Sequence, residues 1–201
     1  METILNQIIV DLHSNMLSKL DTFWPNPRKY FPPEANLSLE IARLGLKYEY
    51  DVYGEVNVGD KKRRDLLLIN NSSKWICQVE VKLVNIYTYR AVINDLKRVK
   101  SKDDLDSAMQ FFSKKIKVEE YSKFGLFVGG DFSWWYAWWL GTSQPLRRKC
   151  FMEKCRDLKK VKSPQEILDE LNSALKGSIN GVYPKNPKER KLWIAYALYE
   201  L

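Results

Sequence analysis

The first 46 residues contain two helical patterns with a proline-rich break between them. In residues 2–20 the apolar residues recur every three or four positions, as on one face of an amphipathic helix. Residues 23–33, FWPNPRKYFPP, then contain four prolines, which lack the amide hydrogen that a helix needs and so end it. A second helix is predicted for residues 34–46, with Leu37, Ile41 and Leu44 on its apolar face.

Residues 47–84 change from helical spacing to the patterns of β-strands. Three strand-like runs follow one another: KYEYDVYGEVNV, RDLLLIN and KWICQVEVKLV. The turns between them, GDKK and NNSS, are short, and a short turn joins antiparallel strands. The sequence therefore predicts an antiparallel three-stranded meander after the second helix.

The chain between residues 89 and 130 returns to helix and then to strand. Residues 89–116 have the spacing of one or two helices, and Ser101 with Asp104 resembles a capping box. The run KFGLFVGG, residues 123–130, is typical of a short buried strand. A strand that follows a helical segment in this way predicts a crossover to a parallel strand. The expected fold is therefore α/β, with a central mixed sheet flanked by helices.

Two further helix starts are predicted toward the C-terminus, at residues 163–166 and 186–189. The first helix is expected to end near residue 177 and the second at the C-terminus. Because no repeat, low-complexity linker or domain break divides the chain, we expect one domain over residues 1–201. Its core is placed at about residues 34–130, with a helical N-terminal extension at 1–24 and a C-terminal helical region at about 141–201.

Composition excludes several classes of protein. With 201 residues, of which 45% are hydrophobic, the chain can bury a core and is not disordered. No stretch approaches the roughly 20 uncharged apolar residues of a membrane span, so no membrane partner is expected. The three cysteines form no zinc or disulfide pattern, and the single histidine, His13, gives no basis for a Ser-His-Asp triad. A reducing, cytoplasmic setting is therefore expected.

A net charge of +8 and a pI of about 9.2 favour a polyanionic partner. The basic residues gather in five clusters, at residues 61–64, 97–102, 114–115, 147–149 and 159–162. Each contact between a basic side chain and a phosphate releases counterions, which stabilises binding to nucleic acid. One cluster alone is more often solvated surface, so the charge indicates a class of partner and no particular site.

An acid and a lysine lie in the middle of the third predicted strand. Glu80 and Lys82 are two residues apart and therefore share a face of the sheet. Asp65 begins the preceding strand, and antiparallel pairing can bring it within about 5.5 Å of Glu80. Two converging carboxylates repel each other unless a cation lies between them, and Mg²⁺ prefers oxygen ligands. Lys82 could orient or deprotonate an attacking water, or stabilise charge on a phosphate.

The segment RRDLLLINNSSKWICQVEVK resembles the core motif of the PD-(D/E)XK nuclease superfamily, with an aspartate at the start of one strand and Glu-X-Lys in the next. The resemblance covers residues 34–100, is closest in spacing to resolvase-like members and implies a restriction-endonuclease-like core. It implies that Asp65, Glu80 and the backbone carbonyl of Val81 hold Mg²⁺, or Mn²⁺ in its place. Lys82 would then assist the attacking water. Arg64 stands where the family usually has proline.

The family usually places a further glutamate on the helix before these strands. Glu34, at the start of the second predicted helix, has the better spacing and is taken as the fourth catalytic residue, with Asp65, Glu80 and Lys82. Glu40 is the alternative. Both glutamates flank the same apolar face on a helical wheel, so the geometry of the helix leaves the choice open.

The residues expected to contact nucleic acid lie around this site: Lys61, Lys62, Arg63, Arg64, Gln78 and Arg90. The basic run at 61–64 lies on the turn before Asp65, and Arg90 comes shortly after the third strand. Gln78 shares the face of Glu80 and Lys82, although a polar residue at the edge of a sheet would show the same pattern. The tryptophan-rich segment 134–139 is more typical of packing or a protein interface than of base stacking.

Together these features predict a Mg²⁺-dependent endonuclease that hydrolyses phosphodiester bonds in DNA, with RNA as substrate and a homodimer left open. One alternative is a non-catalytic nucleic-acid-binding protein, which would bind without metal-dependent cleavage. The other is a protein-assembly subunit with no affinity for nucleic acid. A shared core does not choose among restriction, junction-resolving and defence nucleases.

Overall fold

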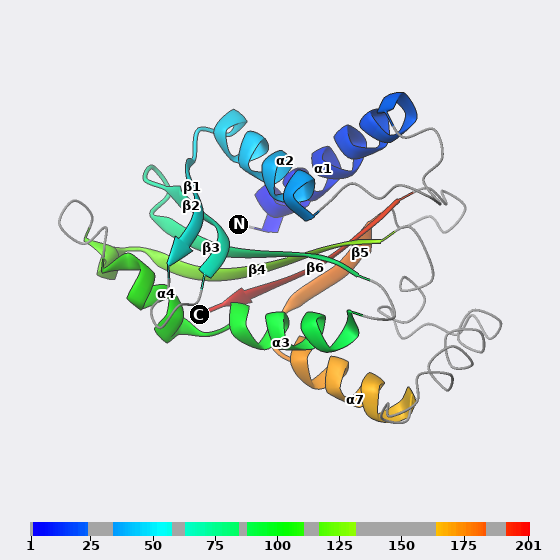
Figure 1. Ribbon diagram of the computed structural model, residues 1–201. Helices are drawn as coiled ribbons and strands as arrows, with labels where there is room; N and C mark the ends of the chain where they lie inside the picture. Colours follow the sequence, from blue (N-terminus) through cyan, green and yellow to red (C-terminus); the bar gives the residue numbers. More distant parts are fainter. Residues whose placement is uncertain are drawn as a thin grey trace.

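The computed structural model describes residues 2–23, 34–57, 63–84, 88–110, 117–131, 164–183 and 192–201, and the structural statements below concern these residues. They form a six-stranded sheet in the order β1-β2-β3-β4-β6-β5 (Figure 1). The bounds of the strands are β1 Asp51–Asn57, β2 Arg63–Asn70, β3 Trp75–Leu83, β4 Ser122–Asp131, β5 Ile179–Tyr183 and β6 Trp193–Glu200.

The pairing of these strands gives a mixed sheet, which confirms the predicted α/β class. The strands β1, β2 and β3 form the predicted antiparallel meander. The strands β3 and β4 are parallel, and the helices between them provide the predicted crossover. The strands β4 and β5 each pair antiparallel with β6.

Helices cover both faces of the sheet (Figure 1). The helices α1 (Glu2–Phe23) and α2 (Glu34–Lys47) pack on one face, where their apolar side chains join those of Val79 and Val81 in one core cluster. The helices α3 (Tyr89–Val99), α4 (Lys102–Met109) and α7 (Pro164–Leu175) pack on the other face, and the 3-10 helix η1 (Val118–Glu120) precedes β4. Because side chains alternate along β3, Glu80 and Lys82 point toward α3.

The helices predicted in the N-terminal half are confirmed. Helix α1 covers the predicted residues 2–20, and α2 begins at Glu34 as expected. The predicted helical stretch after residue 89 consists of α3 and α4, and the Ser101 hydroxyl caps α4 by accepting a hydrogen bond from the Asp104 amide at 3.3 Å.

The C-terminal part of the chain differs from the prediction. The helix predicted from residue 186 to the C-terminus is wrong, because Trp193–Glu200 form strand β6, between β4 and β5. Both faces of β6 are largely buried, so its sequence is an almost continuous apolar run, and such a run does not distinguish a strand from a helix. The helix predicted after residue 163 is confirmed as α7, and the edge strand β5 follows it.

Some predicted features lie outside the described residues. They are Lys61 and Lys62, the basic clusters at 114–115, 147–149 and 159–162, the helix start at 186–189, most of the proline-rich break and the tryptophan-rich segment 134–139. Among the helices that the structure describes, none has the length and apolar character needed to cross a membrane.

The end of α3 is held close to the sheet. A Cβ on Gly125 of β4 would lie 1.9 Å from the carbonyl oxygen of Val99, the last residue of α3, so this position requires glycine. The side-chain amide of Gln78, on β3, donates to the same carbonyl at 2.7 Å. Because the last carbonyls of a helix have no partners within it, these contacts fix the end of α3 against β3 and β4.

Candidate active site

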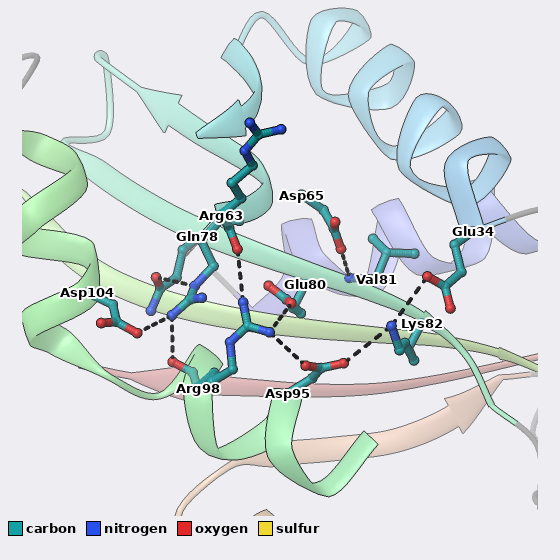
Figure 2. Close-up of polar contacts among 11 residues, drawn as sticks. Glu34, Arg63, Asp65, Gln78, Glu80, Val81, Lys82, Asp95, Arg98 and Asp104 are labelled. Carbon is teal, nitrogen blue, oxygen red and sulfur yellow. Dashed lines mark hydrogen bonds and ion pairs between the residues drawn. The ribbon is translucent and has the colours of Figure 1, made fainter. Parts of the chain in front are cut away.

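Glu34, Asp65, Glu80 and Lys82 converge from three elements, as Figure 2 shows. Leu66 of β2 pairs with Val79 of β3, so Asp65 and Glu80 are the next positions in this register. The Oδ2 atom of Asp65 accepts a hydrogen bond from the backbone amide of Val81 at 2.6 Å. The meander therefore places the carboxylates of β2 and β3 beside each other, as the spacing of the motif predicts.

The start of α2 completes this group through Glu34. Its Oε1 atom accepts from the backbone amide of Leu83 at 3.2 Å, and its Oε2 atom lies 3.4 Å from the ammonium nitrogen of Lys82. Glu34 is therefore the helix carboxylate at the site, in agreement with the favoured alternative.

Glu40, the other alternative, has a different environment. It is buried between α1 and α2, where Asn15 donates to it at 2.8 Å and Arg43 at 2.7 Å. Lys19 of α1 forms an ion pair with its second oxygen. All of these partners belong to α1 and α2, so Glu40 joins the two helices and takes no part in the candidate site.

Helix α3 contributes two residues that the sequence analysis missed. Asp95 is 5% exposed, and its Oδ2 atom lies 3.7 Å from the Nζ atom of Lys82. The Nη1 atom of Arg98 lies 3.0 Å from Asp95 Oδ1 and 3.2 Å from Glu80 Oε1. The signal for Asp95 was its position on the apolar stripe formed by Val92 and Val99, where an acid is costly to bury unless it has a partner.

Burial governs the protonation of the acids in this group. It raises the pKa of Glu80 to about 7, although the nearby guanidinium of Arg98 opposes the rise. Burial also raises the pKa of Asp65, against the hydrogen bond from Val81, and the pKa of Asp95, against the charges of Lys82 and Arg98.

Lys82 responds in the opposite sense to its surroundings. Burial disfavours the charged ammonium, but the carboxylates of Glu34 and Asp95 outweigh burial and raise the pKa of Lys82. At neutral pH its side chain is therefore a cation held between two carboxylates.

The charges within the group do not balance. When every group is ionised, the four carboxylates of Glu34, Asp65, Glu80 and Asp95 face the two cations of Lys82 and Arg98, an excess of two negative charges. The next cation along β2, Arg64, is paired with Asp104 at 2.5 Å.

Two carboxylate oxygens of the group are also without donors. The Oε2 atom of Glu80 is buried and has no hydrogen-bond partner. The Oδ2 atom of Asp95 also lacks a hydrogen bond, because the Lys82 ammonium is an ion-pair partner too distant to donate one. Buried carboxylate oxygens are normally satisfied, so a further cation would fit here.

The oxygen donors suit a hard divalent cation. Within the described ranges, no three or more side chains of His, Cys, Asp or Glu are grouped so as to hold a metal ion. The metal ligands implied by the family resemblance are only Asp65, Glu80 and the carbonyl of Val81. Such a small number is sufficient for Mg²⁺, which usually keeps several waters beside a few protein oxygens. The unpartnered Oε2 atom of Glu80 and the excess of negative charge fit such an ion.

Two residues predicted to contact nucleic acid are instead part of the core. Arg64 is 1% exposed and Gln78 is fully buried, so neither can reach a phosphate at the surface, and that prediction is wrong for both. Arg64 donates to Gln78 at 3.0 Å and to the carbonyl of Arg98 at 3.1 Å. Both side chains therefore satisfy carbonyls at the end of α3, which lack partners within the helix.

Arg63 and Arg90 are exposed, so their predicted contact with nucleic acid stays a prediction. The guanidinium of Arg63 lies 3.1 Å from Glu55 on β1, and its carbonyl accepts from Arg98 at 2.9 Å. Arg90 lies in the first turn of α3.

Comparison of the chain with protein-family models, with curated proteins and with solved structures found no match.

Proposed function

We propose that this protein is a metal-dependent endonuclease of the PD-(D/E)XK type that hydrolyses phosphodiester bonds in DNA. The proposal rests on one observation: Glu34, Asp65, Glu80 and Lys82 come together with an excess of negative charge around a buried carboxylate oxygen without a partner. Acids in such an arrangement cost stability, and they accumulate where a cation is to be bound.

The residues have distinct roles in the proposed reaction. Asp65, Glu80 and the Val81 carbonyl would hold Mg²⁺ or Mn²⁺, which supplies electrophilic stabilisation of the phosphate and lowers the pKa of a water. Glu34 holds the Lys82 ammonium in place. Because its pKa is raised, Lys82 acts as a cation that donates hydrogen bonds to the attacking water or to a phosphate oxygen.

The bond changes are those of direct hydrolysis. The water oxygen forms a bond to phosphorus while the bond between phosphorus and one sugar oxygen breaks. A proton leaves the water, and the departing sugar oxygen ends as a hydroxyl group. One product end therefore carries a phosphate, and no covalent intermediate with the protein is formed.

The charge of the chain supports a nucleic acid as the substrate. The net charge of +8 favours a polyanion, and the exposed Arg63 and Arg90 belong to the elements that carry Asp65 and Asp95. A duplex or branched DNA would present successive phosphates to this surface.

The test is cleavage of plasmid, linear and branched DNA in Mg²⁺ or Mn²⁺, with EDTA as the metal-free condition. We expect metal-dependent nicking by the wild type and a loss of at least about a hundredfold in Lys82→Ala, as for removal of one electrostatic contact to a transition state. The matched control is Lys117→Ala, which removes the same charge from an exposed position paired with Glu120.

The outcomes separate the proposal from its rivals. Binding of DNA that weakens steeply with salt, without cleavage of any substrate, would make the protein a non-catalytic binding module. If the protein neither binds nor cleaves DNA, a role in protein assembly is the remaining alternative. Equal losses in Lys82→Ala and Lys117→Ala would show that cleavage does not depend on this site.

A further inference from the structure

The guanidinium of Arg98 lies where a cation would neutralise Glu80. Its Nη1 atom lies 3.2 Å from Glu80 Oε1 and 3.0 Å from Asp95 Oδ1, so one guanidinium forms ion pairs with two buried carboxylates and donates its hydrogen bond to Asp95. The other oxygen of Glu80, Oε2, is buried and has no hydrogen-bond partner. Arg98 thus neutralises the negative charge of Glu80 only in part.

A divalent cation at Glu80 would be repelled by this guanidinium. Both positive charges would lie at contact distance from the same carboxylate, that of Glu80, which is 6% exposed. One carboxylate cannot hold both cations at full strength.

Arg98 has anchors that do not involve Glu80. Its Nη2 atom donates to the carbonyl of Arg63 at 2.9 Å, and its Nη1 atom keeps Asp95 as a partner. Its backbone carbonyl accepts from Arg64. The guanidinium can therefore leave Glu80 without unfolding α3 and without leaving the site.

We propose that Arg98 is an internal counter-ion exchanged for the divalent cation at Glu80. In the cation-free protein the guanidinium neutralises Glu80. Cation binding displaces it from that carboxylate and frees an N–H donor, beside the site, for a phosphate oxygen of the substrate. This inference rests on the proposed function and adds to it a coupling between cation binding and substrate binding.

The first test measures the affinity of the full chain for Mn²⁺ at pH 8 without DNA, from the electron paramagnetic resonance signal of free Mn²⁺. We expect Arg98→Gln to bind Mn²⁺ about fivefold more tightly than the wild type, because a competing ion pair at a partly exposed site has been removed. Arg98→Lys should stay within about twofold of the wild type, because it keeps the charge.

Two further variants control for general effects of charge. Lys97→Gln removes the same charge from an exposed position one residue away on α3, and its affinity should change by less than about twofold. Glu80→Gln should lose most of the binding, which assigns the measured affinity to this site.

A second test follows Arg98 in the wild type and does not depend on the folding of a variant. Addition of Mg²⁺ should shift the Nε–H resonance of Arg98 in a ¹⁵N-correlated NMR spectrum, and the shift should be absent in Glu80→Gln. Saturation with Mg²⁺ without movement of that resonance would overturn the exchange.

The outcomes distinguish this inference from the proposed function. If the wild type binds Mn²⁺ through Glu80 but Arg98→Gln binds it equally or more weakly, the exchange is wrong and the metal site stands. If the wild type does not bind Mn²⁺, or if Glu80→Gln binds it as well as the wild type, the metal site and the exchange both fail.

Discussion

Replacing Glu80 by glutamine should stabilise the protein at pH 8 and change its stability little at pH 5. Burial raises the pKa of Glu80 from 4.5 to about 7, so the folded protein holds this proton at pH values where the unfolded chain has released it. The resulting penalty to folding is absent below pH 4.5, grows as the pH rises and is complete once the pH passes about 7.

The two pKa values set the size of the effect. A change from 4.5 to about 7 corresponds to roughly 3 kcal/mol of unfolding free energy. Glutamine has the shape of the protonated carboxyl group and keeps an oxygen that can accept from Arg98, but it carries no charge. Glu80→Gln should therefore gain up to about 3 kcal/mol at pH 8 and less than about 1 kcal/mol at pH 5.

The assay is urea unfolding in EDTA at pH 5, 6, 7 and 8, followed by tryptophan fluorescence. The control is Glu119→Gln, which removes the charge of an exposed glutamate on η1. It should change the unfolding free energy by less than about 0.5 kcal/mol at every pH. The proposed penalty to folding is refuted if Glu80→Gln is no more stable than the wild type at pH 8. It is also refuted if the unfolding free energy rises by the same amount at pH 5 and pH 8, because the buried charge of Glu80 would then not be the cause.

Further substitutions test the roles of individual residues. Arg64→Met should destabilise the protein by about 3 kcal/mol in urea unfolding, because the Arg98 carbonyl at the end of α3 and the Asp104 carboxylate on α4 lose their donor, whereas Arg63→Met should change stability by less than about 0.5 kcal/mol. Glu40→Ala should cost about 2 kcal/mol of stability yet retain cleavage per folded molecule, and Glu34→Ala should lose cleavage with little loss of stability. Gly125→Ala should cost about 2 kcal/mol, because its Cβ would collide with the carbonyl at the end of α3.

The meander and the acids on it could be predicted because their geometry is local. Short turns fix the pairing of neighbouring strands, and the two-residue repeat of a strand fixes which side chains share a face. The register that pairs Leu66 with Val79 accordingly brings Asp65 beside Glu80. The choice between Glu34 and Glu40 needed the structure, because it depends on where α1 packs against α2.

The errors involve partners that are distant in the sequence. Strand β6 pairs with β4 and β5 and is buried on both faces, so its apolar run carries no strand period. Arg64 belongs to a basic run typical of a surface, yet its partner Asp104 lies 40 residues further along the chain. Such a contact forms only after α4 has packed on the sheet, and nothing near Arg64 in the sequence indicates it.

Two buried glutamates of this protein show what separates a structural carboxylate from one suited to a cation. Glu40 is 1% exposed and Glu80 is 6% exposed, and burial acts on the pKa of both in the same direction. At Glu40 the hydrogen bonds from Arg43 and Lys19 outweigh burial, and its pKa is lowered.

At Glu80 the single guanidinium of Arg98 is shared with Asp95, one oxygen has no donor, and the pKa is raised. The two pKa values shift in opposite directions because the donors around Glu40 outweigh its burial, whereas at Glu80 burial outweighs the charge of Arg98. A carboxylate left short of one cation gains the most from binding one, and for this reason we propose Glu80 as a ligand of the metal.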